Sequence, residues 1–324
     1  MPHAILVRQP GGPEQLVWEE VEVGEPGPGQ VRIRQTAIGL NFIDVYHRSG
    51  QYPQPGPFIP GVEGAGIVES LGPDVDDLKT GDRVAYAGPI GGYAEQRLIA
   101  ADRLVKLPDD VSDEQAAAMM LQGMTVDMLI RLVWPLHSGD TIFIHAAAGG
   151  VGLIMCQWAA ALGATVIGAV SSDEKAELAR ANGCHHPIVY SRQDFVAEVE
   201  RLTDGKKLPV VYDSVGRDTF IRSLDCLHKR GLMVSFGQAS GPVEQFPLRL
   251  LAQKGSLYLT RPTLFDYVST REELERSAAS LFDAVRTGKV KVDIGQRFPL
   301  AQAADAHRAL ESRETVGSTI LTVN

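Results

Sequence analysis

A run of small residues from His145 to Gly152 has the composition of a turn that binds phosphate groups. It reads His-Ala-Ala-Ala-Gly-Gly-Val-Gly and lies between an apolar segment and a helical one. Gly149 lets the backbone approach a pyrophosphate, and Gly152 lets a helix pack closely on a strand. Free amides at the start of the helix then face the negative charge. The residues predicted at a pyrophosphate are Gly149, Gly150, Val151 and Gly152.

This motif is not decisive by itself. Ala147 takes the place of the first glycine of the dinucleotide fingerprint, and tight turns need glycine for steric reasons even where no ligand binds. The elements on either side therefore decide between a dinucleotide site and a plain turn.

The end of the next predicted strand indicates which dinucleotide binds. An NAD-selective fold places an acidic side chain there, on the ribose 2'-hydroxyl. This chain has Ser171 and Ser172 instead, followed by Lys175, and these groups can donate to a 2'-phosphate. The sequence therefore favours NADPH. In the alternative interpretation, a serine caps the next helix and Lys175 is a solvated charge; capping and phosphate binding are compatible.

Six predicted strands position these residues. They are 141–147, 164–170, 187–190, 210–215, 232–237 and 256–260. Six parallel strands are what a complete dinucleotide-binding fold needs. Between the first two, residues 151–162 are apolar nearly all round, as in a helix packed on a sheet, and Gly163 is a natural terminator.

The rest of the chain predicts a second, β-rich domain. Short alternating runs such as Val31 to Arg34, separated by glycine and proline, are typical of strands in the first third. Thr270 and Glu273 form a capping box at the start of a helix that ends near Gly288. Two strand-like segments, 297–300 and 318–323, flank an alanine-rich helix and match the first domain better than the second.

Composition limits the function classes. A length of 324 residues favours two domains, and a net charge of -9 without a dense basic run disfavours a nucleic-acid partner. Three scattered cysteines indicate a reducing compartment. The apolar run between His3 and Arg8 is too short for a signal peptide or a membrane span, so we predict a cytoplasmic protein without membrane insertion.

Several segments together resemble the zinc-free quinone oxidoreductase (zeta-crystallin-like) family of the medium-chain dehydrogenase/reductase superfamily. They are Ala37 to Asp44, Gly61 to Gly66, Gly81 to Val84, His145 to Gly152, Val211 to Gly216 and Leu310 to Arg313. The resemblance implies an α/β protein: a GroES-like β-rich catalytic domain (1–123 and 263–324) and a Rossmann domain (124–262), with the active site in the cleft between them. It also implies a homodimer formed through the last Rossmann strand, 256–260.

The resemblance further implies that no zinc is bound. Zinc-dependent relatives carry a cysteine at the position of Asn41 and a histidine at that of Val62, and neither replacement is a good zinc ligand. The run Cys184-His185-His186 is the one other metal motif, but successive strand residues point to opposite faces, so ordinary packing is the alternative. Without a Lewis acid, a conjugated carbonyl that already delocalises charge is the suitable hydride acceptor.

Four residues are implied to line the catalytic cleft: Asn41, Tyr46, Tyr52 and Arg261. The Asn41 amide and the two tyrosine hydroxyls can donate to a developing oxyanion, while their rings can pack on a flat substrate. The alternative for each tyrosine is structural packing with a satisfied hydroxyl.

The same resemblance implies a set of cofactor contacts beyond the pyrophosphate turn. Thr125 is expected at the hinge, Ser171 and Lys175 at the 2'-phosphate and Tyr190 near the adenine. Phe236, Gly237 and Gln238 are expected near the nicotinamide, with Asn41, Ser214, Arg261 and Ser318 completing the set. Relatives often carry Gly-Lys where this chain has Gly317-Ser318, which leaves only a hydroxyl there.

The resulting hypothesis is an NADPH:quinone oxidoreductase that transfers hydride without a metal to a small conjugated carbonyl. An NADPH-dependent enone or alkenal double-bond reductase is the first alternative, because it uses the same fold and the same donor. A non-catalytic NADPH-binding protein, crystallin-like or RNA-binding, is the second; the site residues and the acidic charge argue against it.

Overall fold

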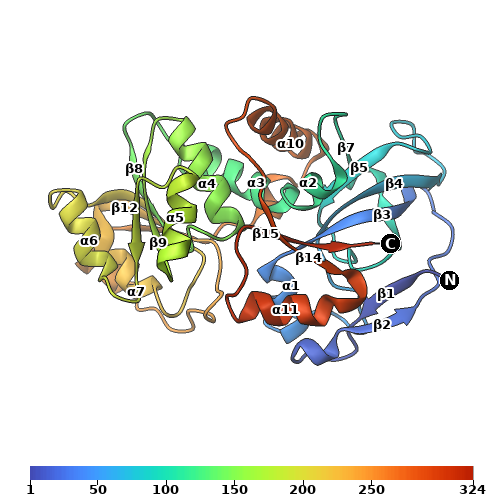
Figure 1. Ribbon diagram of the computed structural model, residues 1–324, viewed down its shortest axis with the longest axis horizontal. Helices are drawn as coiled ribbons and strands as arrows, with labels where there is room; N and C mark the ends of the chain where they lie inside the picture. The colour runs from blue at the N-terminus through green and yellow to red at the C-terminus, as the bar shows by residue number, and fades with distance from the viewer. Residues whose placement is uncertain (324) are drawn as a thin grey trace. The chain divides into compact units, whose positions relative to one another are not determined.

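The computed structural model describes residues 1–323, which divide into two compact units (Figure 1). The first unit contains residues 1–124, 267–286 and those from 292 onward, and the second contains 125–266 and 287–291. Within residues 1–323, no helix combines the length and the apolar composition that crossing a membrane requires.

The second unit is built on a six-stranded sheet in which every neighbouring pair is parallel. In spatial order its strands are β10 (His186–Val189), β9 (Thr165–Val170), β8 (Thr141–Ile144), β11 (Leu208–Asp213), β12 (Leu227–Ser235) and β13 (Tyr258–Thr260). The two halves of the sheet meet between β8 and β11, so the order reverses where a doubly wound fold has its switch point. All six predicted strands are confirmed.

Successive side chains of each strand point to opposite faces of this sheet. Both faces are buried, which explains why the strands are apolar at nearly every position. Phe143, Ile167, Val211 and Met233 form one row across β8, β9, β11 and β12 and belong to a single buried cluster. The intervening residues face the opposite side of the sheet, which is also covered. Burial on both faces leaves no place for polar alternation.

Helices alternate with these strands. They are α4 (Gly150–Ala161), α5 (Asp173–Ala181), α6 (Phe195–Leu202), the short α7 (Phe220–Ser223) and α8 (Arg249–Gln253). Gly163 lies just beyond α4 at φ +87, the left-handed conformation predicted for a terminator. Helix α3 (Met120–Asp127) precedes the sheet and continues as a π-helix over Met128–Val133.

The first unit is β-rich. Its main sheet follows the order β14 (Ile294–Pro299), β15 (Ser318–Thr322), β3 (Gln30–Leu40), β4 (Glu63–Leu71), β5 (Arg83–Ala87) and β7 (Val105–Lys106), with β6 (Gln96–Ala100) paired to β3. Strands β1 (His3–Leu6) and β2 (Val17–Glu20) form a separate antiparallel pair. Its helices are α1 (Phe42–Ser49), α2 (Asp113–Ala117), α10 (Arg271–Arg286) and α11 (Ala303–Glu311).

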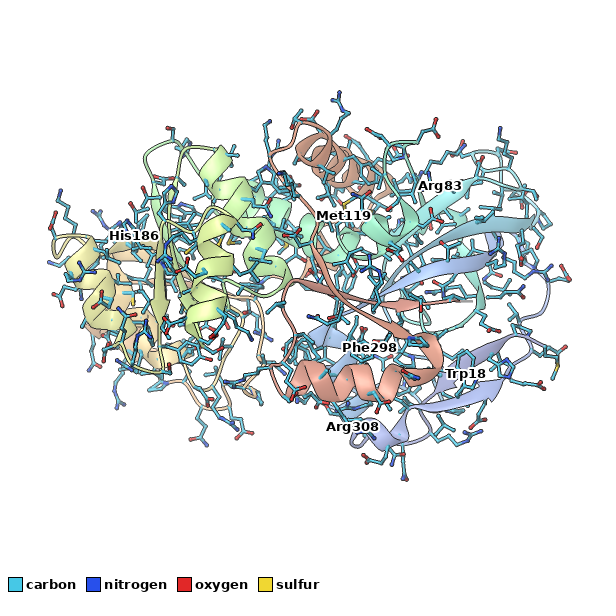
Figure 2. The ribbon with its side chains drawn as sticks, in the orientation of Figure 1. Trp18, Arg83, Met119, His186, Phe298 and Arg308 are labelled. Carbon is cyan, nitrogen blue, oxygen red and sulfur yellow. The ribbon has the colours of Figure 1, made fainter. Side chains whose placement is uncertain are left out.

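The C-terminal segment completes this sheet. Strand β15 pairs antiparallel with the end of β3, placing Thr319 opposite Leu40 and Ile320 opposite Gly39. Trp18 and Phe298, both labelled in Figure 2, pack against the same buried cluster, which includes Leu40 and Leu321. The predicted capping box is present at α10, where the Thr270 amide donates to Glu273 at 3.0 Å and the Glu273 amide donates to Thr270 at 3.2 Å. The predicted fold class is confirmed.

Candidate active site

Asn41 lies where β3 ends and α1 begins. It has an extended backbone (φ -135, ψ 156), and its amide donates to the Asp44 carboxyl group at 2.9 Å. This contact satisfies one of the free amides at the helix start and stops the strand at this point. Gly50 ends the helix at φ +81. Helix α1 carries Asp44 and Tyr46, and Asn41 caps its start.

The Asn41 side chain belongs to a buried chain of hydrogen bonds. Its Nδ2 donates to Glu63 Oε2 at 2.7 Å, and its Oδ1 accepts from Gln122 Nε2 at 3.0 Å. Gln122 Oε1 accepts from the Ser318 hydroxyl at 2.8 Å, and Glu63 Oε1 accepts from the Leu121 amide at 2.7 Å. One amide hydrogen of Asn41 and its oxygen are therefore held by the protein. The Ser318 hydroxyl, predicted to contribute to the cofactor, donates to Gln122.

Glu63 is fully buried, and burial raises the pKa of its carboxyl group to about 8. The absence of a side chain at Gly39 makes room for it, since a Cβ there would lie 2.2 Å from Glu63 Oε2. The hydrogen bonds from Asn41 and Leu121 oppose the shift by favouring the charged form. A second buried carboxyl group, that of Asp44, has its pKa raised to about 7 by desolvation.

A second buried chain joins α1 to α11. The Tyr93 hydroxyl lies 3.0 Å from Asp44 Oδ2 and 3.0 Å from His307 Nε2, and His307 Nδ1 lies 3.2 Å from Arg48 Nη1. Arginine can only donate, so His307 accepts at Nδ1 and carries its hydrogen on Nε2. Burial lowers the pKa of His307 to about 3, which keeps the ring neutral. Arg48 ends the chain in a bidentate ion pair with Glu311.

The two predicted tyrosines lie together. Tyr46 is buried, and its ring meets that of Tyr52 edge to face with 5.2 Å between centroids. The Tyr52 amide donates to the Tyr46 carbonyl at 3.0 Å, which fixes the turn after α1. His47 approaches Tyr52 at 6.1 Å, and burial lowers the pKa of His47 to about 4. Asn41, Tyr46 and Tyr52 all belong to the first unit, whereas Arg261 belongs to the second.

The predicted phosphate turn follows β8 in the second unit. Ala146 has φ +54, and the Ala147 amide donates to Ala169 of β9 at 3.0 Å, which anchors the turn to the sheet. A Cβ on Gly152 would lie 2.2 Å from the Ala146 carbonyl oxygen and 2.8 Å from the Ala147 Cα. Only glycine fits there, and Gly149 precedes the first turn of α4. This cradle fits a dinucleotide pyrophosphate.

Ser172 caps α5, since its hydroxyl accepts from the Lys175 amide at 3.3 Å. The capping interpretation of Ser172 is therefore confirmed, and Ser171 directly precedes the cap. Half-exposed Tyr190 follows β10, and its amide donates to the Val170 carbonyl at 3.1 Å. Arg192 lies beyond it in a bidentate ion pair with Asp173. Hydroxyl, cationic and aromatic side chains therefore follow the carboxyl ends of β9 and β10.

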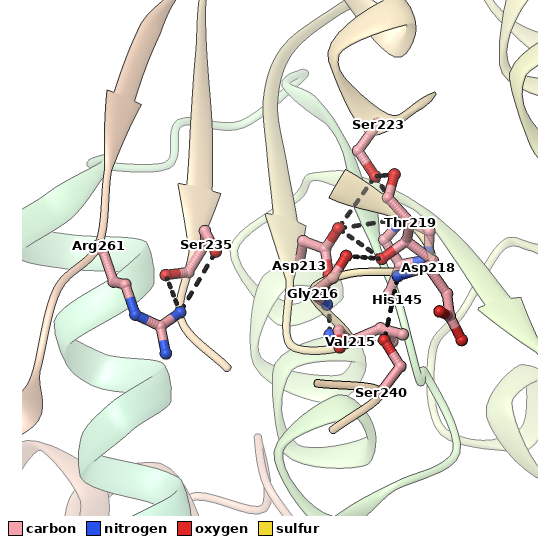
Figure 3. Close-up of polar contacts among 10 residues, drawn as sticks. All are labelled: His145, Asp213, Val215, Gly216, Asp218, Thr219, Ser223, Ser235, Ser240 and Arg261. Carbon is pink, nitrogen blue, oxygen red and sulfur yellow. Dashed lines mark hydrogen bonds and ion pairs between the residues drawn. The ribbon is translucent and has the colours of Figure 1, made fainter. Parts of the chain in front are cut away.

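Asp213 organises the turn after β11 (Figure 3). Its Oδ1 accepts from the amides of Val215 and Gly216 at 2.8 and 3.0 Å. Its Oδ2 accepts from the hydroxyls of Thr219 and Ser223 at 2.8 and 3.1 Å. The carboxylate is fully buried, so these four donors replace water.

His145, Asp213 and Ser223 have the residue types of a hydrolytic triad but not its geometry. His145 directs the same atom, Nε2, toward Ser223 Oγ at 2.8 Å and toward Asp213 at 3.9 Å, whereas a triad uses opposite ring nitrogens. All three side chains are buried, and burial lowers the pKa of His145. The group therefore stabilises the turn.

Arg261, after β13, ties together the segment that follows β12. Its Nη1 donates to the Ser235 carbonyl at 3.2 Å and to the Gly237 carbonyl at 3.2 Å, and its Nη2 donates to Gln238 Oε1 at 2.8 Å. Gly237 packs so closely on the preceding turn that a Cβ would lie 2.6 Å from the Ser214 carbonyl oxygen. Arg261 therefore lies beside Gly237 and Gln238, which follow Phe236 in the sequence. Ser214 lies on the other side of Gly237. Thr125 lies at the start of this unit.

Sequence reasoning missed several residues of these networks, among them Glu63, Gln122, Asp213 and Arg192. A carboxylate within an apolar or glycine-rich strand was an available signal, because such a group is rarely buried without partners. Glu63 and Asp213 both fit that description. Gln122 and Arg192 had no comparable signal in the sequence.

The donor set does not fit zinc. The Asn41 amide is engaged by Glu63 and Gln122, and Val62 offers no donor atom. In the run beginning at Cys184, His185 Nδ1 accepts from the Val166 amide at 3.0 Å. Among residues 1–323, no group of three or more His, Cys, Asp or Glu side chains could hold a metal ion.

Comparisons with known proteins agree with this architecture. The family model described as alcohol dehydrogenase GroES-like domain matches residues 27–109, and that described as zinc-binding dehydrogenase matches residues 150–281. A quinone oxidoreductase of Pseudomonas aeruginosa is 56% identical over 313 residues, 96% of each chain. A 2-haloacrylate reductase of Burkholderia is 48% identical over 329 residues, 98% of each chain. The crystal structure of Escherichia coli quinone oxidoreductase complexed with NADPH matches with a TM-score of 0.98 at 48% identity, covering 99% of this chain and 100% of that one.

A GroES-like unit combined with a Rossmann unit that carries a glycine cradle defines a medium-chain dehydrogenase/reductase. Within that superfamily, the chain belongs to the quinone oxidoreductase family.

Proposed function

We propose that this protein is an NADPH-dependent quinone reductase that needs no metal. The observation that carries the proposal is the Gly152 cradle, where a Cβ would meet the backbone of the phosphate turn at 2.2 Å. The relatives named quinone oxidoreductase, and the E. coli structure complexed with NADPH, support it. NADPH, when bound, supplies the hydride.

The second unit would hold the cofactor along the carboxyl ends of its strands. We assign the pyrophosphate to Gly149 through Gly152, and the 2'-phosphate to Ser171 and Lys175. Tyr190 would lie at the adenine. Phe236, Gly237 and Gln238 would lie near the nicotinamide, with Asn41, Thr125, Ser214, Arg261 and Ser318 completing the contacts. The hydroxyl and cationic groups after β9 support NADPH over NADH, since no acidic side chain replaces Ser171 or Ser172.

The first unit would bind the acceptor through Asn41, Tyr46 and Tyr52, with Arg261 assigned to the same step. Charge develops on the acceptor oxygen as hydride arrives, and preorganised N–H and O–H donors stabilise that charge. The edge-to-face tyrosine pair offers aromatic surface for a flat ring. The proton that completes the reduction would come from water.

We propose that hydride transfer proceeds without zinc. The second family model carries zinc in its description, but Asn41 and Val62 lie outside the residues it matches. Elemental analysis of purified protein should find no stoichiometric zinc, and chelators should leave turnover unchanged. Tightly bound zinc at one per chain, lost together with activity, would overturn this part of the proposal.

The similarity to 2-haloacrylate reductase supports a second candidate, reduction of a carbon–carbon double bond conjugated to a carbonyl group. The decisive experiment compares NADPH oxidation with a benzoquinone, a simple enone and 2-chloroacrylate, each also run with NADH. A kcat/KM highest for the quinone supports the first function, and one highest for an alkene supports the second. Tight NADPH binding without turnover of any acceptor would indicate a non-catalytic protein.

We also propose that the protein forms a homodimer through β13. We further propose that it is cytoplasmic and has no nucleic-acid partner. Strand β13 is the last strand of its sheet, and Tyr258 and Leu259 on it are exposed. The free, buried cysteines support a reducing compartment. Light scattering during size-exclusion chromatography should give twice the chain mass, and Leu259→Lys should shift it toward the monomer. A monomeric wild-type protein would contradict the dimer.

A further inference from the structure

We propose that Glu63 is a positioning residue for hydride transfer. Its carboxyl group sets which way the Asn41 amide faces, and thereby where the acceptor meets an N–H donor. The inference rests on the proposed function only for its last step, the contact between Asn41 and the acceptor.

The chain of hydrogen bonds around Asn41 has a direction. The Ser318 hydroxyl donates to Gln122, Gln122 Nε2 donates to Asn41 Oδ1, and Asn41 Nδ2 donates to Glu63 Oε2. A carboxyl group accepts at both oxygens when ionised and keeps acceptor capacity when protonated, whereas an amide accepts only at its single oxygen. Glu63 also accepts from the Leu121 amide, so both of its oxygens are acceptors. The series of hydrogen bonds therefore ends at Glu63.

This direction matters because a side-chain amide keeps nearly the same shape when it turns by 180°. Only its hydrogen-bond partners choose between the two orientations. Glu63 makes that choice for Asn41, because its carboxyl oxygen accepts from Nδ2. Gln122 follows, because its Nε2 must face Asn41 Oδ1 and its Oε1 must face Ser318.

Burial makes the selection strict. Glu63 is fully buried, Asn41 and Gln122 are each 8% exposed, and Ser318 is 3% exposed. Water therefore does not readily replace a missing partner, and an unpaired donor here lowers the free energy of unfolding. The space for Glu63 depends on Gly39, because a Cβ at that position would lie 2.2 Å from Oε2.

One hydrogen on Asn41 Nδ2 stays outside the network. Glu63 takes the first, and among residues 1–323 no side chain or backbone group accepts the second. That hydrogen is a donor with a fixed direction, on the residue that begins the helix carrying Tyr46. A preorganised donor of this kind contributes when charge forms on the acceptor oxygen, because it needs no rearrangement at that moment.

The test is a pair of substitutions that reverse the direction of these hydrogen bonds. In Glu63→Gln alone, one oxygen faces the two donors Asn41 and Leu121, so one bond is lost whichever way the new amide turns. Adding Gln122→Glu gives every group a partner again, because donation then runs from residue 63 through Asn41 to residue 122. The double variant therefore restores the number of bonds while turning the Asn41 amide by 180°.

Glu63→Gln should lower the melting temperature by a few degrees and kcat for the preferred acceptor about tenfold or more. The Kd for NADPH should stay within about twofold. The double variant should recover most of the melting temperature while its kcat stays low. Glu114→Gln, which removes a half-exposed carboxylate paired with Arg297 in the same unit, is the matched control and should change neither quantity.

A double variant that regains both stability and turnover would show that Glu63 is merely structural, and would overturn the proposal. So would a Glu63→Gln variant with full turnover. Melting temperatures are measured without a quinone or enone. If the double variant does not regain the melting temperature, that result alone refutes the proposed direction of the hydrogen bonds. Inactivity of the wild-type protein toward every acceptor is a different result, which refutes the proposed function.

Discussion

Asp213 is the residue whose replacement tests the architecture of the second unit most directly. Its carboxylate accepts two backbone amides, from Val215 and Gly216, and two hydroxyls, from Thr219 and Ser223. It is fully buried at the end of β11. We compare Asp213→Asn with Asp213→Ala.

Asp213→Asn retains one oxygen for the two amides, and its new NH₂ group can donate to the hydroxyls, which turn to accept. The variant then loses the additional strength that a charged acceptor gives to each hydrogen bond. The hydroxyls also donate to carbonyl groups, so the loss falls mainly on the two amide bonds. Hydrogen bonds to charged groups contribute about 1.5–3 kcal/mol and neutral ones about 0.5–1.5 kcal/mol, so a loss of about 1–1.5 kcal/mol for each of these two bonds gives about 2–3 kcal/mol. In Asp213→Ala, the hydroxyls keep their contacts with the Gly216 and Thr219 carbonyls, but both amides lose their acceptor. At about 1–3 kcal/mol for each orphaned donor, plus a cavity, the loss should reach about 4–6 kcal/mol.

Denaturant unfolding followed by circular dichroism measures both losses, and NADPH titration by fluorescence reports on the turn that carries Ser214. Affinity should fall more for alanine than for asparagine. Asp218→Asn, at the exposed neighbouring position, is the control and should change the unfolding free energy by less than about 0.5 kcal/mol. If Asp213→Ala were no more destabilising than Asp218→Asn, the carboxylate would not be holding this turn.

Four further predictions concern the cofactor turn, the acceptor and the buried carboxyl groups. Gly152→Ala should weaken NADPH binding at least about tenfold in a fluorescence titration, because the new Cβ meets backbone atoms 2.2 Å away. Lys175→Glu should weaken NADPH at least about tenfold, from the loss of a charge-assisted contact of about 1.5–3 kcal/mol, with little change for NADH; equal weakening would contradict the 2'-phosphate assignment. Tyr46→Phe should lower turnover on the order of tenfold or less at unchanged NADPH affinity, since it removes one donor but keeps the ring; complete loss would make Tyr46 a general acid. Burial raises the pKa of Asp44 from 3.8 to about 7 and that of Glu63 from 4.5 to about 8, so the folded state binds these protons more tightly than the unfolded state. Their stabilisation is complete below the unfolded pKa values and is lost as pH rises through the folded ones, so the unfolding free energy measured with denaturant should fall as pH rises from 4.5 to about 8.

The local sequence was sufficient to predict the second unit. Its strands are buried on both faces, so they read as short apolar runs between turn residues, and all six were recognised. The glycine cradle was also readable, because the residues that shape it lie within eight positions of one another, from His145 to Gly152. The capping box of α10 is equally local, since Thr270 and Glu273 lie three residues apart. In each case the interacting groups are close in the chain, so their spacing alone predicts the geometry.

The hydrogen-bond partners of the site were beyond such reasoning. Asn41 was predicted as a donor to the acceptor, but its orientation depends on Glu63, 22 residues away, and on Gln122, 81 residues away. Gln122 in turn depends on Ser318, 196 residues further on, which β15 brings beside β3. Composition and periodicity do not encode which of many buried polar groups will meet. That is decided when the strands pair, because each buried donor must then find an acceptor among the groups the topology has placed beside it.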